Sequence, residues 1–230
     1  PLFGSAGSDN PEVITALLSL LQQAFARNLP GLQQALTRQE LHRAAQNNNF
    51  EVIRALITAL KRAFDGDQAG LQRALVQGNE FNDTPLYRAA ENNNPEVIRA
   101  LITALQEAFA LNQNGLRRAL TCQVDNFFTP LHSAAENRNP EVIRTLISAL
   151  KDAFTVNQDG LRRALTYRDA LGQRPLHRAA TNRNPLVIKA LFDLFQLAFI
   201  HNPGRFQQAL TQQNNENKTG FFCKPHNKLQ

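Results

Sequence analysis

The sequence has no methionine and no tryptophan, and only two of its 230 residues are cysteine. Two cysteines cannot build a disulfide framework, and their scarcity favours a reducing compartment, so we expect a cytoplasmic protein. No apolar run approaches the roughly 18 residues that a membrane-spanning helix needs, so no segment is expected to cross a membrane. Because methionine is absent and the chain opens with Pro1, we expect a part excised from a longer protein, whose targeting signal would not be visible.

Charge is also scarce, at 19% of residues, and 25 basic against 19 acidic side chains leave a net charge of +6. This is a modest basic excess without the run of like charges that marks a nucleic-acid-binding tail. With 43% apolar residues the composition is that of a globular chain rather than a disordered one.

Internal repetition is what the sequence has in abundance. The string Leu-(His/Tyr)-x-Ala-Ala recurs every 45 residues, and its copies begin at Leu41, Leu86, Leu131 and Leu176. The string Gly-Leu-x-x-Ala-Leu keeps the same spacing from Gly70 to Gly160. We therefore predict one repeat domain over residues 1–212, followed by a degenerate sixth-repeat start and polar tail at 213–230. Its repeats are expected at about 1–39, 40–84, 85–129, 130–174 and 175–212.

Each repeat is expected to hold three helices. In residues 84–128 the first begins at Pro85, and the second is capped by Asn94 and begins at Pro95. The second carries an apolar stripe at helical spacing from Val97 to Phe109, and the third is short, from Leu116 to Leu120. One repeat cannot bury such a stripe alone. We therefore predict an all-α fold, an α-solenoid of about five stacked repeats joined by hairpin-like loops.

The segments Thr84 to Ala90 and Thr129 to Ala135 resemble the opening of the ankyrin repeat, Thr-Pro-Leu-His-x-Ala-Ala. The period exceeds the ankyrin period of about 33 residues by about 12, which matches a longer second helix plus the third one. Three helices in 45 residues also suit HEAT or armadillo stacks, which remain the alternative. Two departures concern glycine: Arg138 replaces the usual glycine between helices, and the loop at 124–128 lacks the glycine that the family has at its turn.

No catalytic constellation is present. The sequence lacks a Gly-rich phosphate loop, His-Glu-x-x-His and Gly-x-Ser-x-Gly. Three histidines share one repeat position with Tyr87, which predicts turn hydrogen bonding and packing rather than acid–base chemistry; they are His42, His132 and His177. Cys223 and His226 have ligand-like spacing, but two ligands do not make a zinc site. We expect no enzyme, no cofactor and no metal.

Repeated basic residues form two series. In the first, Arg54, Arg99 and Arg144 each follow a glutamate by three residues, which indicates a paired, solvated face. The second series has no acid within its expected short helix and could form an anion-attracting stripe; it consists of Arg73, Arg117, Arg118, Arg162 and Arg163. Its partner would be a phosphoinositide, a nucleic acid or an acidic protein. No aromatic residues interleave with it, so single-stranded nucleic acid is disfavoured.

The resemblance to ankyrin repeats implies a non-enzymatic scaffold that binds a protein partner in a groove of loop tips and first helices. We expect apolar tip residues to anchor that partner, namely Phe81, Phe127, Phe128 and Leu171. We also expect a monomer that does not bind nucleic acid. The partner-binding positions implied are Arg43, Gln46, Asn47, Glu80, Phe81, Asp83, Arg88, Glu91, Asn92, Asp125, Asn126, Phe128, Ser133, Glu136, Asn137, Leu171, Gln173, Arg178, Thr181 and Asn182.

Two alternatives stay open beside this scaffold. The arginine stripe could bind an anionic partner, or the repeats could present substrates to a catalytic domain elsewhere in a longer effector enzyme. The Asn- and Gln-rich repeats are similar in composition to ankyrin proteins that intracellular bacteria secrete into host cells. This similarity implies the host cytoplasm as a second location.

Overall fold

The computed structural model describes residues 11–25, 28–37, 40–182, 184–216 and 219. Across these residues the fold is helical, with no strand beyond an isolated bridge between Gln213 and Thr219, so the all-α prediction is confirmed. The chain divides into two compact units, Pro1–Ala119 (unit 1) and Leu120–Gln230 (unit 2). No described helix is both long and apolar enough to cross a membrane. The predicted domain limit at residue 212 remains a prediction.

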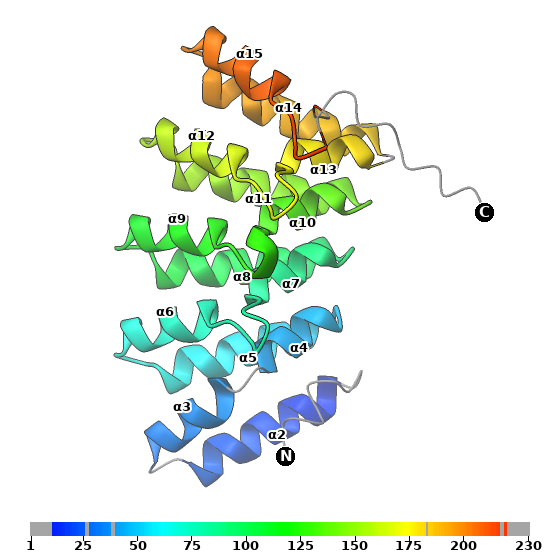
Figure 1. Ribbon diagram of the computed structural model, residues 1–230. Coiled ribbons are helices and arrows are strands. Elements are labelled where there is room, and N and C mark those ends of the chain that lie inside the picture. Colours follow the sequence, from blue (N-terminus) through cyan, green and yellow to red (C-terminus); the bar gives the residue numbers. More distant parts are fainter. Residues whose placement is uncertain (1–10, 26–27, 38–39, 183, 217–218, 220–230) are drawn as a thin grey trace, which may run out of the picture. The chain divides into compact units, whose positions relative to one another are not determined.

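Unit 1 stacks its helices repeat upon repeat (Figure 1). The long helices α2, α5 and α8 contact one another in order, and the short helix α4 packs on α7. The expected first helix of the first repeat falls on residues 1–10, outside the described residues. The elements are α2 (Pro11–Ala24), α3 (Leu29–Thr37), α4 (Glu40–Gln46), α5 (Phe50–Ala63), α6 (Gln68–Val76), α7 (Pro85–Glu91), α8 (Pro95–Ala108) and α9 (Gln113–Thr121), the last of which crosses the unit boundary.

Unit 2 repeats the same plan. The first helix α10 packs on α13, the long helix α11 packs on α14, and α12 also contacts α14. The arrangement confirms three helices per repeat. The elements are the 3-10 turn η1 (Asp125–Phe127), α10 (Pro130–Glu136), α11 (Pro140–Ala153), α12 (Gln158–Thr166), α13 (Pro175–Thr181), α14 (Pro185–Phe199) and α15 (Pro203–Thr211).

The long helices begin where the sequence predicts. The side chain of Asn94 accepts a hydrogen bond from the Glu96 N–H at 3.0 Å, and Asn139 and Asn184 do the same at their helices. An asparagine cap followed by proline satisfies or removes the unpaired N–H groups of the first turn, which fixes the helix start. The expected cap at Asn10 lies outside the described residues.

The apolar stripe from Val97 to Phe109 is buried as predicted. The third helix is longer than predicted, because it begins at Gln113 rather than Leu116. Its start is fixed by the Asn112 side chain, which accepts a hydrogen bond from the Gly115 N–H at 2.9 Å. A Cβ atom at Gly115 would lie 2.5 Å from the Phe109 ring, so glycine is required for this close approach.

The expected strain at Arg138 is absent. The chain leaves α10 through Asn137 with φ −67° and ψ 137°, an extended conformation that any residue adopts, and Arg138 is not in the left-handed region. At the corresponding turn of the preceding repeats only Asn48 has a positive φ among the described residues, at 62°. The junction is therefore closed by the side-chain contacts of asparagine and does not need a glycine.

Candidate functional site

The loop at 79–83 in unit 1 is closed by an asparagine. The Asn79 N–H donates to the Asp83 carbonyl at 3.0 Å, and the Asn79 side-chain oxygen accepts from the N–H groups of Phe81 and Asp83 at 2.9 Å each. Asn82 supplies the left-handed residue with φ 57°. This closure leaves Phe81 56% exposed, in agreement with its predicted place at the tip.

The loop at 169–173 in unit 2 has the same closure. The Asp169 N–H donates to the Gln173 carbonyl at 2.9 Å, while the Asp169 carboxylate accepts from the N–H groups of Leu171 and Gln173 at 2.8 Å each. Gly172 takes the left-handed conformation, with φ 70°, and a Cβ there would lie 2.2 Å from the Asn215 side chain. Leu171 is left 54% exposed.

The loop at 124–128 has the same backbone closure without a glycine. The Val124 N–H donates to the Phe128 carbonyl at 2.8 Å, and Asn126 and Phe127 both have φ 60°. A bulky residue in the left-handed region is strained, so Phe127 is held there by the loop rather than by its own preference. Its side chain is 60% exposed.

The two loops of unit 2 lie side by side, because the Ala170 N–H donates to the Asn126 carbonyl at 2.8 Å. Exposed apolar residues therefore stand on neighbouring loops, with an exposed carboxylate beside them on α10. We call this set the loop surface: Asp125, Asn126, Phe127, Glu136 and Leu171.

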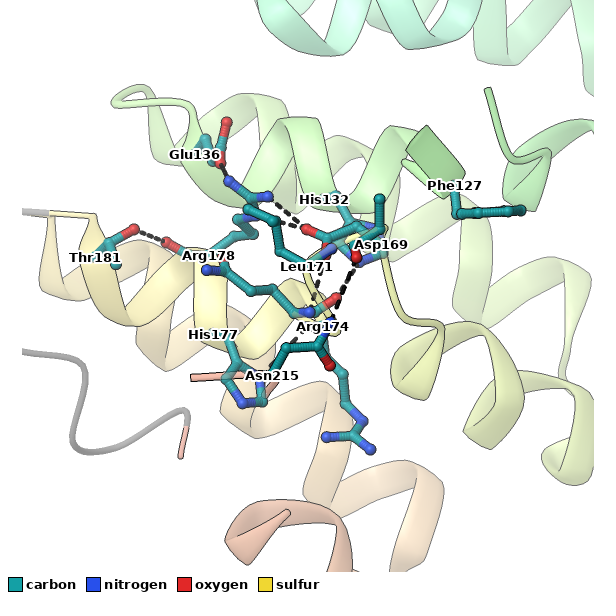
Figure 2. Close-up of polar contacts among 12 residues, drawn as sticks. Phe127, His132, Glu136, Asp169, Leu171, Arg174, His177, Arg178, Thr181 and Asn215 are labelled. Atoms are coloured by element: carbon teal, nitrogen blue, oxygen red, sulfur yellow. Dashed lines mark hydrogen bonds and ion pairs between the residues drawn. The ribbon is translucent and has the colours of Figure 1, made fainter. Parts of the chain in front are cut away.

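Beneath the loop surface, Arg178 of α13 connects two repeats (Figure 2). Its guanidinium donates to one oxygen of Asp169 through Nε at 3.0 Å and Nη2 at 2.5 Å, and through Nη1 to Glu136 at 2.6 Å. It also lies over the Phe128 ring, 4.5 Å from its centroid. The Asp169 side chain is 0% exposed, so this carboxylate is entirely paired. We call these four residues the Arg178 cluster.

Unit 1 has a smaller counterpart around Arg88 of α7. Arg88 donates to Asp83, on the loop before α7, at 2.6 Å and to Glu91, on α7 itself, at 2.9 Å. Here the acid stands at the end of the loop, whereas in unit 2 it stands at the start. We call these three residues the Arg88 cluster.

His132 joins α10 to the next loop. Its Nδ1 accepts from the Thr129 N–H at 3.2 Å, so Nε2 carries the proton and donates to the Gln173 carbonyl at 3.2 Å. Burial lowers the pKa of His132 to about 4, against the weaker opposing effect of the Gln173 carbonyl. His42 contacts the Gln77 carbonyl in the same way at 2.7 Å. The predicted role in turn hydrogen bonding is confirmed at these two histidines.

Several residues predicted to contact a partner are instead part of the scaffold. Asp83, Ser133 and Asn137 are buried, so their expected exposure is wrong. Asn92 donates to the carbonyls of Ala45 and Gln46 in the preceding repeat. Asn182 does the same to Ala135 at 2.9 Å and Asn137 at 2.7 Å. These amides satisfy the unpaired carbonyls at the ends of first helices, which is why asparagine recurs there.

The other predicted contact residues divide by exposure. Phe128 is half-buried under Arg178, which corrects the prediction of an exposed tip; Phe127 is the exposed one. Gln173 has its backbone N–H and carbonyl committed to Asp169 and His132. Arg43, Arg88, Gln173 and Arg178 are half-exposed, and Gln46, Asn47, Glu80, Glu91, Asp125, Asn126, Glu136, Leu171 and Thr181 are exposed.

The arginine stripe splits into two series of repeat positions. Gln72 and Arg162 share one repeat position, and each donates to a carbonyl at the end of the next repeat's long helix. Gln72 donates to the Ala108 carbonyl at 2.7 Å, and Arg162 donates to the Ala198 carbonyl at 2.8 Å. The prediction that no acid shares these helices is wrong for α12, which begins at Gln158 and includes Asp159, the ion-pair partner of Arg162 at 2.6 Å. The exposed series is Arg73, Arg118 and Arg163, while Arg117 is half-buried.

Two residues of the site were missed by the sequence reasoning. Asp169 closes its loop and pairs with Arg178. The sequence feature that could have identified it is its place 90 residues, or two repeats, after Asn79, which closes the loop at 79–83 in the same way. Arg174 stands where earlier repeats carry Thr84 and Thr129 as helix caps, yet it is 3% exposed and its Nε and Nη1 have no hydrogen-bond partner in the described part of the chain. Burial lowers the pKa of Arg174 to about 10.

In the described ranges no three His, Cys, Asp or Glu side chains come together as metal ligands, and Cys223 and His226 lie outside those ranges.

A family model of ankyrin repeats in three copies matches residues 2–109, 41–159 and 105–201. The match favours ankyrin repeats over the HEAT or armadillo alternative. No curated protein matches the chain.

Proposed function

This chain belongs to the ankyrin repeat family, and on that premise we propose that it is a non-enzymatic scaffold whose loop surface in unit 2 docks a protein partner. Ankyrin repeats are a protein–protein interaction module, so a protein is the expected class of partner. We propose further that the chain acts as a monomer in a reducing compartment, as its few cysteines suggest.

One observation carries the choice of surface. Phe127 and Leu171, both more than half exposed, stand on neighbouring loops joined by a backbone hydrogen bond. Apolar anchors within a polar rim are the usual composition of an interface centre, and exposed Asp125 and Glu136 supply that rim.

The rigidity of this surface supports the same proposal. The loops are closed by hydrogen bonds and rest on the Arg178 cluster, so Leu171 is presented by an ordered backbone. A preformed surface has less conformational entropy to lose when a partner binds. The strained left-handed conformation of Phe127 fits a position kept for binding rather than for stability.

The experiment is quantitative affinity capture with the folded chain, followed by mass spectrometry and measurement of the dissociation constant for the partner found. The double variant Phe127→Ala with Leu171→Ala should weaken binding by at least tenfold, since interface anchors contribute about 2 kcal/mol or more each. Phe128 is left intact because its ring packs on Arg178. A substitution of Phe128 would therefore also disturb the scaffold.

The control truncates two exposed apolar side chains elsewhere in unit 2. Val156 and Ile200 are 88% and 66% exposed and lie outside the loop surface. Val156→Ala with Ile200→Ala should leave affinity unchanged. Equal losses in the two double variants, or none in either, would place the binding site away from the loop surface.

A further inference from the structure

A second surface in unit 2 lies between the third helices of its two repeats. A groove of about 490 Å³ is bounded by α12, α14 and α15. Its walls carry three arginines and one acid, namely Arg162, Arg163, Arg205 and Asp159. None of these residues belongs to the loop surface, so the groove is an independent feature of the unit.

The groove holds more positive charge than its own acid can neutralise. Asp159 pairs with Arg162 at 2.6 Å, and this ion pair, followed by the charges of Arg205 and Arg163, lowers the pKa of the Asp159 carboxyl. Neither Arg163 nor Arg205 forms an ion pair with any residue in the described part of the chain. Two arginines therefore line the groove without an ion-pair partner in the described part of the chain.

Arg162 is held in place more firmly than a surface arginine. Its Nη1 donates to the Ala198 carbonyl at 2.8 Å, and its guanidinium lies 5.9 Å from the Phe199 ring centroid. Asp159 thus occupies one edge of a fixed arginine, in the manner of a carboxylate ligand. Arginine matches carboxylates through paired N–H donors, which makes a carboxylate the natural ligand for the remaining two.

We propose that this groove binds an acidic segment of a protein partner, with two carboxylates of that segment pairing with Arg163 and Arg205. The two arginines project from different helices, α12 and α15, which suits two separated carboxylates better than one phosphate group. The side-chain amides of Gln208 and Gln212 line the same groove and can bond the backbone of an extended peptide.

The sequence contains matched controls for this site. Asn114 occupies the position of Asp159 in the preceding repeat and accepts from Arg117 at 2.9 Å, so Asp159→Asn keeps the local contact while removing the competing charge. Arg73 and Arg118 are exposed arginines of unit 1 at the repeat position of Arg163. Removing them changes the net charge as much as removing Arg163 and Arg205 does.

The probe is a fluorescently labelled peptide with a Glu-Gly-Glu core in a Gly-Ser background, titrated with the full chain at low salt and followed by anisotropy. Arg163→Gln with Arg205→Gln should weaken binding about tenfold or more, while Arg73→Gln with Arg118→Gln should change it less than twofold. Asp159→Asn should tighten binding several-fold. The Gln-Gly-Gln peptide should not bind.

Equal losses of affinity in the two double arginine variants would show that the peptide is attracted by net charge alone, and would overturn the proposed binding site in the groove. An unchanged affinity in Asp159→Asn would do the same, because a peptide in the groove must compete with that carboxylate. Tighter binding of a phosphoserine peptide or of single-stranded DNA than of the Glu peptide would overturn the assignment to carboxylates. Circular dichroism of each variant checks that the helices are retained.

Discussion

The Arg88 cluster of unit 1 and the Arg178 cluster of unit 2 occupy the same place in their repeats but connect different things. Arg88 pairs with Asp83 on the loop before α7 and with Glu91 on its own helix. Arg178 pairs with Asp169 on the loop before α13, with Glu136 on the preceding first helix α10, and with the Phe128 ring. The loop shape is thus specified by backbone closure in both units, while the position of the glutamate decides whether the arginine pairs within its own helix or with the preceding first helix.

The largest expected difference in stability between the two clusters comes from removing the aspartate that pairs with each arginine. Asp169→Ala should lower the free energy of unfolding by about 3–5 kcal/mol, because it removes the buried carboxylate that binds Nε and Nη2 of Arg178 and leaves two loop N–H groups without this acceptor. Asp83→Ala should cost about 1–3 kcal/mol, since Asp83 receives one arginine nitrogen at 2.6 Å. Urea unfolding followed by circular dichroism measures both. Equal losses would contradict the comparison, and exposed Asp125→Ala is the control that should change nothing.

The next effect depends on pH. The pKa of His132 is about 4 in the folded chain and near 6.5 when unfolded, so between these values only the unfolded chain binds the proton. Stability is therefore fully present above pH 6.5 and falls as the pH drops towards 4. His132 should account for a loss of about 2 kcal/mol between about pH 7 and pH 5.

His132→Tyr, which introduces the residue found at Tyr87, should reduce this loss by that amount. The measurement is the urea midpoint of both proteins across the pH series. Parallel curves for wild type and variant would show that His132 does not titrate as its burial requires.

A smaller gain is expected from Arg174→Thr. The variant removes a buried guanidinium with unpaired nitrogens and restores the helix cap that Thr84 makes by accepting from the Tyr87 N–H at 3.2 Å. Unfolding should become harder by about 1–2 kcal/mol. The reverse change, Thr129→Arg, should destabilise. A loss of stability in Arg174→Thr would contradict a net cost of burying this guanidinium.

The smallest effect is expected at the edge of the Arg178 cluster. Glu136→Gln should cost less than about 1 kcal/mol, because the Glu136 side chain is 43% exposed and the pair is screened by water and salt. Glu91→Gln in the Arg88 cluster is the matched comparison. Thermal melts at low and high salt check both, and a loss above about 2 kcal/mol at Glu136 would make this contact, rather than Asp169, the main link between repeats.

The fold could be predicted from the sequence because it depends on residues that recur. Asn94 and its equivalents fix the helix starts, and the stripe from Val97 to Phe109 fixes the buried face. The caps and the stripe recur every 45 positions with the same role each time, so one copy explains the others.

The candidate site could be predicted only in part, because its chemistry lies where the repeats differ. The exposed tips at Phe81, Phe127 and Leu171 followed from loop position. The burial of Asp83 and Phe128 did not, since it depends on which way Arg88 and Arg178 turn, and that choice is made by packing between repeats. The pairing of Arg162 with Asp159 was missed because α12 begins earlier than its apolar residues indicate.

The most direct test of the loop surface is site-specific photo-crosslinking. A benzophenone side chain placed at Leu171 should crosslink the protein partner efficiently, and the same group at Val156, also exposed in unit 2, should not. Crosslinking from Val156 alone, or equally from both positions, would contradict a docking site formed by Phe127 and Leu171.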